Sequence, residues 1–355
     1  MSKKTRVLVV EDSLTVRRHL CALLAADPEI ELAGEAADGR TAIELCRAVR
    51  PDVMTIDMML PIMSGLAATE YIMAHCPTPI LIVSSSFNRG ELFRTYDALA
   101  AGAVDALEKP SGSEPDGAWQ RAFVARVKLI ARIPVITHPR LRLAELLHSA
   151  APAPPLLPRQ RHPAVIAIGA STGGPAAIVE VLRGIPAAIR QPILFVLHIN
   201  EPFGTSFAEW LDGQTRHRVA YATDGDPVAA AGGRVVMAPP GRHLIVCDGR
   251  LRLTRDAERH SCRPSVDVLF ESVAREYGDG AAAALLTGMG RDGAAGLLAI
   301  RRAGGATIAQ DEASSIVYGM PREAVALGAA ERVLPLNEIG PALGLLAAAP
   351  PADWA

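Results

Sequence analysis

The apolar residues of the first third of the chain form short, unbroken runs that alternate with stretches of helical spacing. The runs are RVLVV at 6–10, DVMTID at 52–57, ILIVSS at 80–85 and AVDAL at 103–107. Continuous runs of this length are typical of strands buried on both faces. The alternation therefore predicts an α/β domain with a parallel sheet covered by helices on both faces.

The first helix of this alternation is predicted over residues 14–26. Apolar residues recur there at helical spacing from Val16 to Leu24, and Ser13 just before them is of a type that caps helix N-termini. In such sheets, ligands bind beyond the carboxyl ends of the strands. The residues that directly follow each apolar run are therefore the first candidates for a functional site.

A second block with the same pattern begins near residue 163. AVIAIGASTGGPAAIVEVL at 164–182 predicts a strand, a tight Gly-rich turn and a helix, and PILFVLHI at 192–199 predicts the next strand. The segment 280–300 again reads as a strand, a Gly-rich turn and a helix. We expect a second α/β domain, doubly wound and Rossmann-like, with a largely parallel sheet.

The two blocks are separated by residues 134–162, which we predict to be a linker. From Pro134 to Pro163 the chain has seven prolines, a composition that resists compact packing. A short amphipathic helix is predicted inside it, over 141–149. The expected domains are residues 1–133 and 163–355, and a chain of 355 residues is long enough for both.

Charge and composition narrow the possible functions. Residues 163–355 carry 17 basic and 20 acidic side chains, which disfavours a second domain that reads DNA, and we expect no nucleic-acid partner. No apolar run approaches the roughly 18 to 20 residues that span a bilayer, so we expect a cytoplasmic protein without membrane insertion. Five cysteines without a CxxC pair indicate neither a disulfide framework nor a zinc site.

Polar residues end several of the first domain's apolar runs. Glu11 and Asp12, Asp57, Ser84 and Lys109 all stand there, and Lys109 is one of only four lysines in the chain. Three carboxylates at one sheet edge repel one another unless a cation neutralises them, and Mg²⁺ suits such an oxygen-rich site. Asp57 is placed as a nucleophile for an acyl phosphate. The alternative, solvated loop acids, is weaker for five positions in register.

The segments VVEDS, TIDMMLPIMSG, IVSS and GAVDALEKP resemble the receiver domain of two-component response regulators over about residues 5–130. The resemblance implies that Asp57 is phosphorylated and that Ser84 and Lys109 contact the phosphoryl group. It implies Mg²⁺ bound by Glu11, Asp12, Asp57 and the carbonyl of Met59. It also implies a flavodoxin-like fold for this domain. Receivers often have Phe or Tyr three residues before the lysine, whereas here that residue is Ala106, so the resemblance does not extend to the aromatic part of the usual switch.

The second domain has a candidate nucleophile at its Gly-rich turn. Gly169 to Gly173 fits G-x-S-x-G, the pattern that projects a serine hydroxyl, here Ser171, above a sheet. His198, near the end of the next strand, is placed as its base if the two strands are parallel neighbours. The alternatives are that the glycines bind a phosphate, that Ser171 caps the helix, and that His198 is an ordinary strand residue.

Asp292 is a candidate to orient the imidazole, because it follows the strand and turn within 280–300. The backbone between Met289 and Gly290 is placed to present an N–H group to an oxyanion. The alternative is that Asp292 caps the helix that begins near Gly293. Spacing alone does not choose among this acid and three others, which are Asp224, Asp226 and Asp311.

Long segments of the second domain resemble the catalytic domain of chemotaxis protein-glutamate methylesterases (the CheB family) across about residues 163–345. They are IGASTGG, LHINEPFGTSFAEWLD, APPGRHL, SVDVLFESVA, LTGMGRDGAAG and AQDEASSIVYGMPREA. The resemblance implies a triad of Ser171, His198 and Asp292, with Thr172 and Met289 near the oxyanion. The family usually has Gln-His-Met-Pro around the histidine, where this chain has Leu197, His198, Ile199 and Asn200.

The resemblance further implies hydrolysis of glutamate γ-methyl esters on chemoreceptors, deamidation of glutamines, a sensor histidine kinase as phosphodonor and control by the receiver. We expect Mg²⁺ in the first domain and no cofactor in the second. Two other functions compete, a phosphorylation-controlled binding or adaptor protein of a non-chemotactic pathway with weak or divergent hydrolase activity, and a receiver-controlled transcription factor. The second is disfavoured because no helix-turn-helix pattern is evident.

Overall fold

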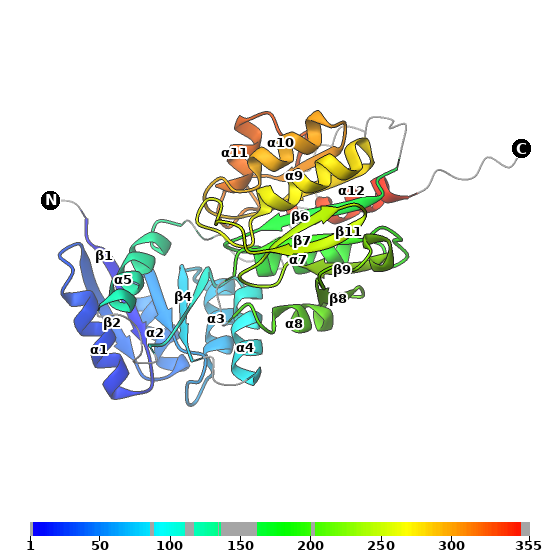
Figure 1. Cartoon of the computed structure of the whole chain (residues 1–355). Coiled ribbons are helices and arrows are strands. Elements are labelled where there is room, and N and C mark those ends of the chain that lie inside the picture. Colours follow the sequence, from blue (N-terminus) through cyan, green and yellow to red (C-terminus); the bar gives the residue numbers. More distant parts are fainter. Residues whose placement is uncertain are drawn as a thin grey trace, which may run out of the picture. The chain divides into compact units, whose positions relative to one another are not determined.

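The computed structural model describes residues 3–85, 89–110, 117–133, 135, 162–199 and 203–348. The chain divides into two compact units, residues 1–150 and 151–355 (Figure 1). The predicted linker and its helix over 141–149 lie almost wholly outside the described residues.

The first unit is a five-stranded parallel sheet in the order β2-β1-β3-β4-β5. Its strands are β1 (Thr5–Val10), β2 (Ile30–Ala36), β3 (Val53–Ile56), β4 (Ile80–Ser84) and β5 (Asp105–Glu108). Its helices are α1 (Leu14–Ala25), α2 (Gly39–Val49), α3 (Gly65–His75), α4 (Arg89–Ala100) and α5 (Ala118–Ile130). The predicted parallel α/β fold is confirmed, including the Ser13 cap, whose side chain accepts from the backbone N–H of Val16.

The sheet of the second unit has seven strands, all parallel, in the order β14-β13-β12-β6-β7-β9-β8. The strands are β6 (Val165–Ala170), β7 (Ile193–Leu197), β8 (Arg218–Tyr221), β9 (Arg234–Met237), β12 (Ala281–Leu285), β13 (Ala306–Gln310) and β14 (Arg332–Leu334). An antiparallel hairpin of β10 (His243–Cys247) and β11 (Arg250–Thr254) stands beside it.

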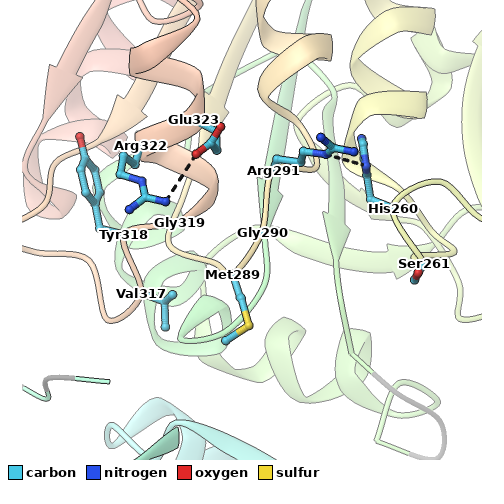
Figure 2. Close-up of a pocket in the computed structure, with 10 residues that line it drawn as sticks. All are labelled: His260, Ser261, Met289, Gly290, Arg291, Val317, Tyr318, Gly319, Arg322 and Glu323. Atoms are coloured by element: carbon cyan, nitrogen blue, oxygen red, sulfur yellow. Dashed lines mark hydrogen bonds and ion pairs between the residues drawn. The ribbon is translucent and has the colours of Figure 1, made fainter. Parts of the chain in front are cut away.

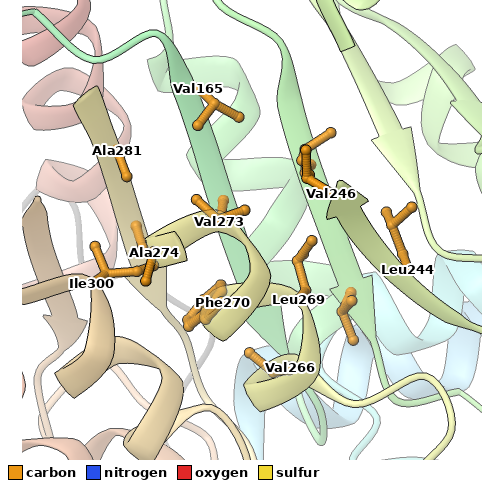
Figure 3. Packing of buried hydrophobic residues seen from close by; sticks show 14 of the residues in the cluster. Val165, Leu244, Val246, Val266, Leu269, Phe270, Val273, Ala274, Ala281 and Ile300 are labelled. Atoms are coloured by element: carbon orange, nitrogen blue, oxygen red, sulfur yellow. The ribbon is translucent and has the colours of Figure 1, made fainter. Parts of the chain in front are cut away.

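Helices cover this sheet on both faces. They are α7 (Gly174–Gly184), α8 (Phe207–Gln214), α9 (Val266–Tyr277), α10 (Ala294–Arg302), α11 (Met320–Ala326) and α12 (Leu336–Ala347), with short 3₁₀ turns at Val228–Ala231 and Gly278–Gly280. On β6, Val165 and Ala167 pack into a cluster with α9 and α10, and Figure 3 shows Val165 facing the apolar side of α9. Ile166 and Ile168, equally buried, alternate with them and so face the other side.

This core fixes which strand ends meet. β6 lies between β7 and β12, with Ala170 paired to Leu197 and Gly169 paired to Leu285. Gly169 is required there, because a Cβ atom would lie 2.2 Å from Cγ1 of Val266 at the start of α9. The carboxyl ends of three neighbouring strands and the N-terminus of α9 therefore converge at one edge of the sheet.

Candidate active site and phosphorylation site

In the first unit, Lys109 lies between two buried carboxylates. Its ammonium donates to Asp57 Oδ2 at 2.8 Å and lies 3.2 and 2.9 Å from the two oxygens of Glu11. Glu11 is 1% exposed and Asp57 5% exposed. One cation thus balances two acids brought together from the ends of β1 and β3.

The titration of these groups follows from burial and mutual contact. Burial raises the pKa of the Glu11 carboxyl, and the hydrogen bond and charge of Lys109 offset only part of that rise. Burial acts to lower the pKa of Lys109, but its hydrogen bonds to Asp57 and Glu11 outweigh this effect and raise it. The lysine is therefore held in its charged form.

The same pocket of acids has the donor set that Mg²⁺ prefers. Carboxylate oxygens of Glu11, Asp12 and Asp57 lie within 4.8 Å of one another, and Asp12 is exposed. Glu11 Oε2, although near the Lys109 ammonium, is buried without a hydrogen bond of good geometry among the described residues. A buried acceptor of this kind beside two more carboxylates fits a divalent cation bound through oxygen.

The other residues named for this domain lie on β4, on β5 and after β3. Ser84 at the end of β4 is fully buried and its hydroxyl donates to the carbonyl of Ser85 at 3.5 Å. The Met59 side chain is exposed and its sulfur accepts from Arg94. Ala106 lies in β5, where its carbonyl accepts from Arg126 at 3.1 Å.

In the second unit, Ser171 and His198 directly follow the last paired residues of β6 and β7, Ala170 and Leu197. The backbone N–H of His198 donates to the carbonyl of Ala170 at 3.0 Å, which completes this last pair of the ladder. The alternative that Ser171 caps α7 is wrong, because Gly173, with φ +78°, is the N-cap and no side chain bonds there. The serine hydroxyl is therefore not used by the helix.

Asp292 contacts the imidazole, and it does not cap the helix that follows it. His198 Nε2 donates to Asp292 Oδ2 at 2.8 Å. The N-cap of α10 is Gly293, without a side-chain bond, so the capping alternative for α10 is wrong. Instead the carboxylate accepts from the backbone N–H groups of Val266, at 2.7 Å, and Asp267, at 3.1 Å, in the first turn of α9.

A layer of further residues holds this aspartate, and sequence reasoning did not single these residues out. Ser265 Oγ donates to Asp292 Oδ1 at 2.7 Å. Asp267 is fully buried and accepts from His260 Nε2 at 3.1 Å, and His260 Nδ1 accepts from Arg291 at 3.3 Å. Only the presence of Ser265 and Asp267 in the SVDVLFESVA segment signalled their importance, because their contacts with Asp292 are long-range.

Cys262 was also missed. Its Sγ lies 3.6 Å from His198 Nδ1, within hydrogen-bond range for sulfur. Both ring nitrogens of His198 are thus engaged, one by Asp292 and one by Cys262. Within the part of the chain that the structure describes, the Ser171 hydroxyl makes no hydrogen bond to the imidazole.

The charges at this site favour a protonated imidazole. Burial acts to lower the pKa of His198, but the hydrogen bond to Asp292 and the contact with Cys262 outweigh it and raise the pKa to about 9. Burial acts to raise the pKa of Asp292, but hydrogen bonds from His198 and Ser265 more than offset this, and the pKa is lowered. The pair is held as a carboxylate and an imidazolium.

A pocket of about 740 Å³ lies beside these residues. Figure 2 shows the Met289 side chain between two pairs of lining residues, Arg291 turned toward His260 on one side and Arg322 with Glu323 on the other. Next in the chain to Met289, which lines the pocket, Gly288 packs so closely on Ser171 that a Cβ atom at Gly288 would lie 2.7 Å from Cβ of Ser171.

Two of the other acids named as candidates, Asp224 and Asp311, bind groups elsewhere in this unit. Asp224 Oδ1 accepts from the backbone N–H of Leu253, and Asp311 Oδ1 accepts from the N–H and hydroxyl of Ser314. His198, Cys262 and Asp292 together have ligand atoms within 4.8 Å of one another, but the oxygens of Asp292 already accept four hydrogen bonds.

Among the described residues, no helix is long and apolar enough to cross a membrane.

A receiver-like acid cluster in one unit and a Ser/His/Asp arrangement in the other define a class, the response regulators whose second domain is an enzyme. The family model "CheB methylesterase" matches residues 166–343, and "Response regulator receiver domain" matches residues 7–115. The chain belongs to the CheB methylesterase family. It combines that domain with a receiver domain in front of it.

Two similar proteins match this chain along nearly their whole length. A protein-glutamate methylesterase/protein-glutamine glutaminase of Anaeromyxobacter dehalogenans is 46% identical, covering 95% of this chain and 96% of the relative. One of Pseudomonas aeruginosa is 45% identical, with 95% of each chain covered. The solved catalytic domain of the Thermotoga maritima CheB methylesterase is 33% identical, with a TM-score of 0.49. The match covers 52% of this chain and 98% of the solved domain.

Proposed function

We propose that this chain is a phosphorylation-controlled protein-glutamate methylesterase, in which Ser171 is the nucleophile, His198 the general base and Asp292 the residue that orients the base. The observation that carries the assignment is the 2.8 Å hydrogen bond from His198 Nε2 to Asp292. A carboxylate accepts only, so Nε2 carries a proton and Nδ1 is the nitrogen left to take one from serine. His198 follows Leu197, the partner of Ala170 in the sheet, as Ser171 follows Ala170.

The reaction is two successive acyl transfers. Ser171 Oγ attacks the γ-carbonyl of a glutamate methyl ester while His198 accepts the hydroxyl proton, and the same proton then leaves with methanol. Water, deprotonated by His198, cleaves the glutamyl ester of Ser171 to glutamate and free serine. With a glutamine side chain, the first step releases ammonia in place of methanol, which is the glutaminase activity named for the relatives.

The oxyanion of the tetrahedral intermediate forms at the turn that joins β6 to α7. We assign its stabilisation to backbone N–H groups near Thr172 and Met289. Thr172 is half-buried, and its carbonyl accepts from the Thr287 hydroxyl at 2.9 Å, which fixes this turn to the end of β12. Preorganised donors of this kind contribute most to such reactions.

Asp57 is the phosphorylated residue of the receiver domain. A sensor histidine kinase is the phosphodonor, and Lys109 and Ser84 bind the phosphoryl oxygens. Glu11, Asp12, Asp57 and the Met59 carbonyl would hold Mg²⁺, which when bound supplies positive charge against the carboxylates and the incoming phosphoryl group. Lys109 supports this role because it already contacts Asp57 Oδ2.

The substrates are methylated chemoreceptors, and the place of action is their cytoplasmic part. Phosphorylation of Asp57 raises the esterase rate and so produces adaptation. The binding or adaptor alternative gains no support from the site, because Ser171 does not serve as a helix cap.

A serine-directed fluorophosphonate tests the assignment of the nucleophile. Peptide mass mapping should find the adduct on Ser171 in the wild-type chain, and the Ser171→Ala variant should remain unlabelled. The Asp292→Asn variant should be labelled far more slowly at the same residue. Labelling at another serine, or equal labelling of all three proteins, would contradict the assignment.

A further inference from the structure

Cys262 occupies the position at His198 that the mechanism assigns to serine. Its Sγ lies 3.6 Å from Nδ1, while Asp292 is bound to Nε2. The Cys262 thiol donates its own proton to the carbonyl of His260 at 3.4 Å, so its sulfur accepts from the protonated Nδ1, and a protonated Nδ1 has no lone pair for the Ser171 proton. This agrees with the lack of a Ser171 to His198 hydrogen bond among the described residues.

The loop that carries Cys262 is built to hold it at this place. Arg259 and Cys262 exchange backbone hydrogen bonds of 3.2 and 2.9 Å, and between them His260 and Ser261 have φ values of +52° and +58°, which non-glycine residues rarely adopt. Arg259 is tied to α9 by two hydrogen bonds to Glu271, of 2.7 and 2.8 Å. The turn is thus attached to α9 through Arg259, and this attachment holds the Cys262 thiol next to the imidazole.

We propose that Cys262 is a positioning residue for the general base, which holds Nδ1 of His198 in place of the Ser171 hydroxyl and so withholds the base until the thiol contact is broken. The proposal rests on the proposed function for the role of His198, but the contact itself does not depend on that role. Sulfur is a weak hydrogen-bond acceptor, so loss of the Nδ1 proton and replacement of this contact by the Ser171 hydroxyl cost little.

The groups that face His198 give the proposal a pH signature. Asp292 and Cys262 contact the ring and both favour its protonated form, which brings its pKa to about 9. The buried Asp267 lies behind Asp292, and Nε of the Arg259 guanidinium lies 3.6 Å from Asp267 Oδ2. Loss of the Cys262 contact leaves all the other groups in place and makes the imidazole easier to deprotonate.

The test compares the pH dependence of kcat/KM in the full-length wild type and in Cys262→Ala. The acidic limb should move about one pH unit lower in Cys262→Ala, which corresponds to up to about tenfold higher kcat/KM below the wild-type limb and little change above it. The gain should appear in kcat, with KM unchanged. Cys247→Ala is the matched control, because it removes another thiol of the same unit. Cys247 is exposed, and its thiol donates a hydrogen bond to Asp248.

Titration of the His198 imidazole by ¹⁵N NMR in histidine-labelled protein keeps the test independent of activity, with His198→Asn to assign the signal. The midpoint should fall by about one pH unit in Cys262→Ala and stay fixed in Cys247→Ala. A midpoint that stays fixed or rises in Cys262→Ala would overturn the proposal. If the wild type titrates as expected but releases no methanol, the proposed function fails and the positioning contact stands.

Discussion

Replacement of Asp292 by asparagine separates the chemical role of this residue from its structural one. The carboxylate accepts four hydrogen bonds, from His198 and Val266 on Oδ2 and from Ser265 and Asp267 on Oδ1. An amide has one accepting oxygen and a nitrogen that only donates. Either orientation of Asp292→Asn therefore leaves two former donors facing an NH₂ group.

The expected magnitudes follow from which donors can adapt. With the amide oxygen on the Oδ1 side, the NH₂ group faces His198 and Val266. His198 can adopt the tautomer in which Nε2 accepts from this NH₂ group, but the Val266 N–H is fixed and loses its acceptor. One buried backbone donor without a partner costs about 1–3 kcal/mol. In the new tautomer Nδ1 carries the proton, so the base is unusable for Ser171, and we expect kcat to fall by about 10⁴-fold, as for the same change in other serine triads.

The assay is steady-state kcat/KM on a methyl ester substrate, together with the free energy of unfolding from denaturant titration. Asp311→Asn is the matched control, since Asp311 is a partly exposed acid of the same unit that binds a Ser314 turn. It should lose a similar or smaller free energy of unfolding and keep its rate. If Asp292→Asn kept kcat/KM within tenfold of wild type, the role of this carboxylate in orienting the base would be refuted.

Three further changes have defined outcomes. A proton must leave His198 before it acts as a base, and its pKa is raised to about 9, so kcat/KM should rise with pH through about 9. The raised pKa also stabilises the folded state. This contribution is fully present below about pH 6.5 and is lost as pH rises through about 9. Activity already at its plateau at pH 7, or a free energy of unfolding without this loss, would contradict this. Lys109→Met leaves two buried carboxylates without their cation. The free energy of unfolding of the receiver domain should fall by about 3–5 kcal/mol, and MgCl₂ should partly reverse this loss. An unfolding curve equal to that of the wild type would contradict this prediction. Gly288→Ala places a Cβ atom 2.7 Å from Cβ of Ser171 and should cost about 1–3 kcal/mol with a large loss of kcat, whereas wild-type stability and rate would show that the turn has room to move.

The fold could be predicted where the apolar pattern is strong. The runs that became β1, β3, β4, β6 and β7 are continuous, largely buried and too short for a typical helix, which favours strands. The edge strand β2 was not identified, because its sequence IELAGEA is polar and largely exposed in the middle. Edge strands bury fewer residues and therefore leave a weaker pattern.

The site could be predicted only in part from local sequence. Ser171 and His198 were found because each ends a strand and parallel neighbours bring strand ends together. Spacing alone did not choose Asp292, and its resemblance to a cap of α10 was misleading, since the carboxylate binds the start of α9. Cys262 reaches the imidazole across 64 residues of sequence, a contact that depends on packing alone.

The most direct test of the central claim is methanol release from methylated receptor membranes by the full-length chain and by Ser171→Ala, each with and without a small-molecule phosphodonor. The account predicts release by the wild type that rises with the phosphodonor, and none by Ser171→Ala under either condition. Asp57→Asn should retain basal release and lose the response. Equal release by wild type and Ser171→Ala would contradict the account.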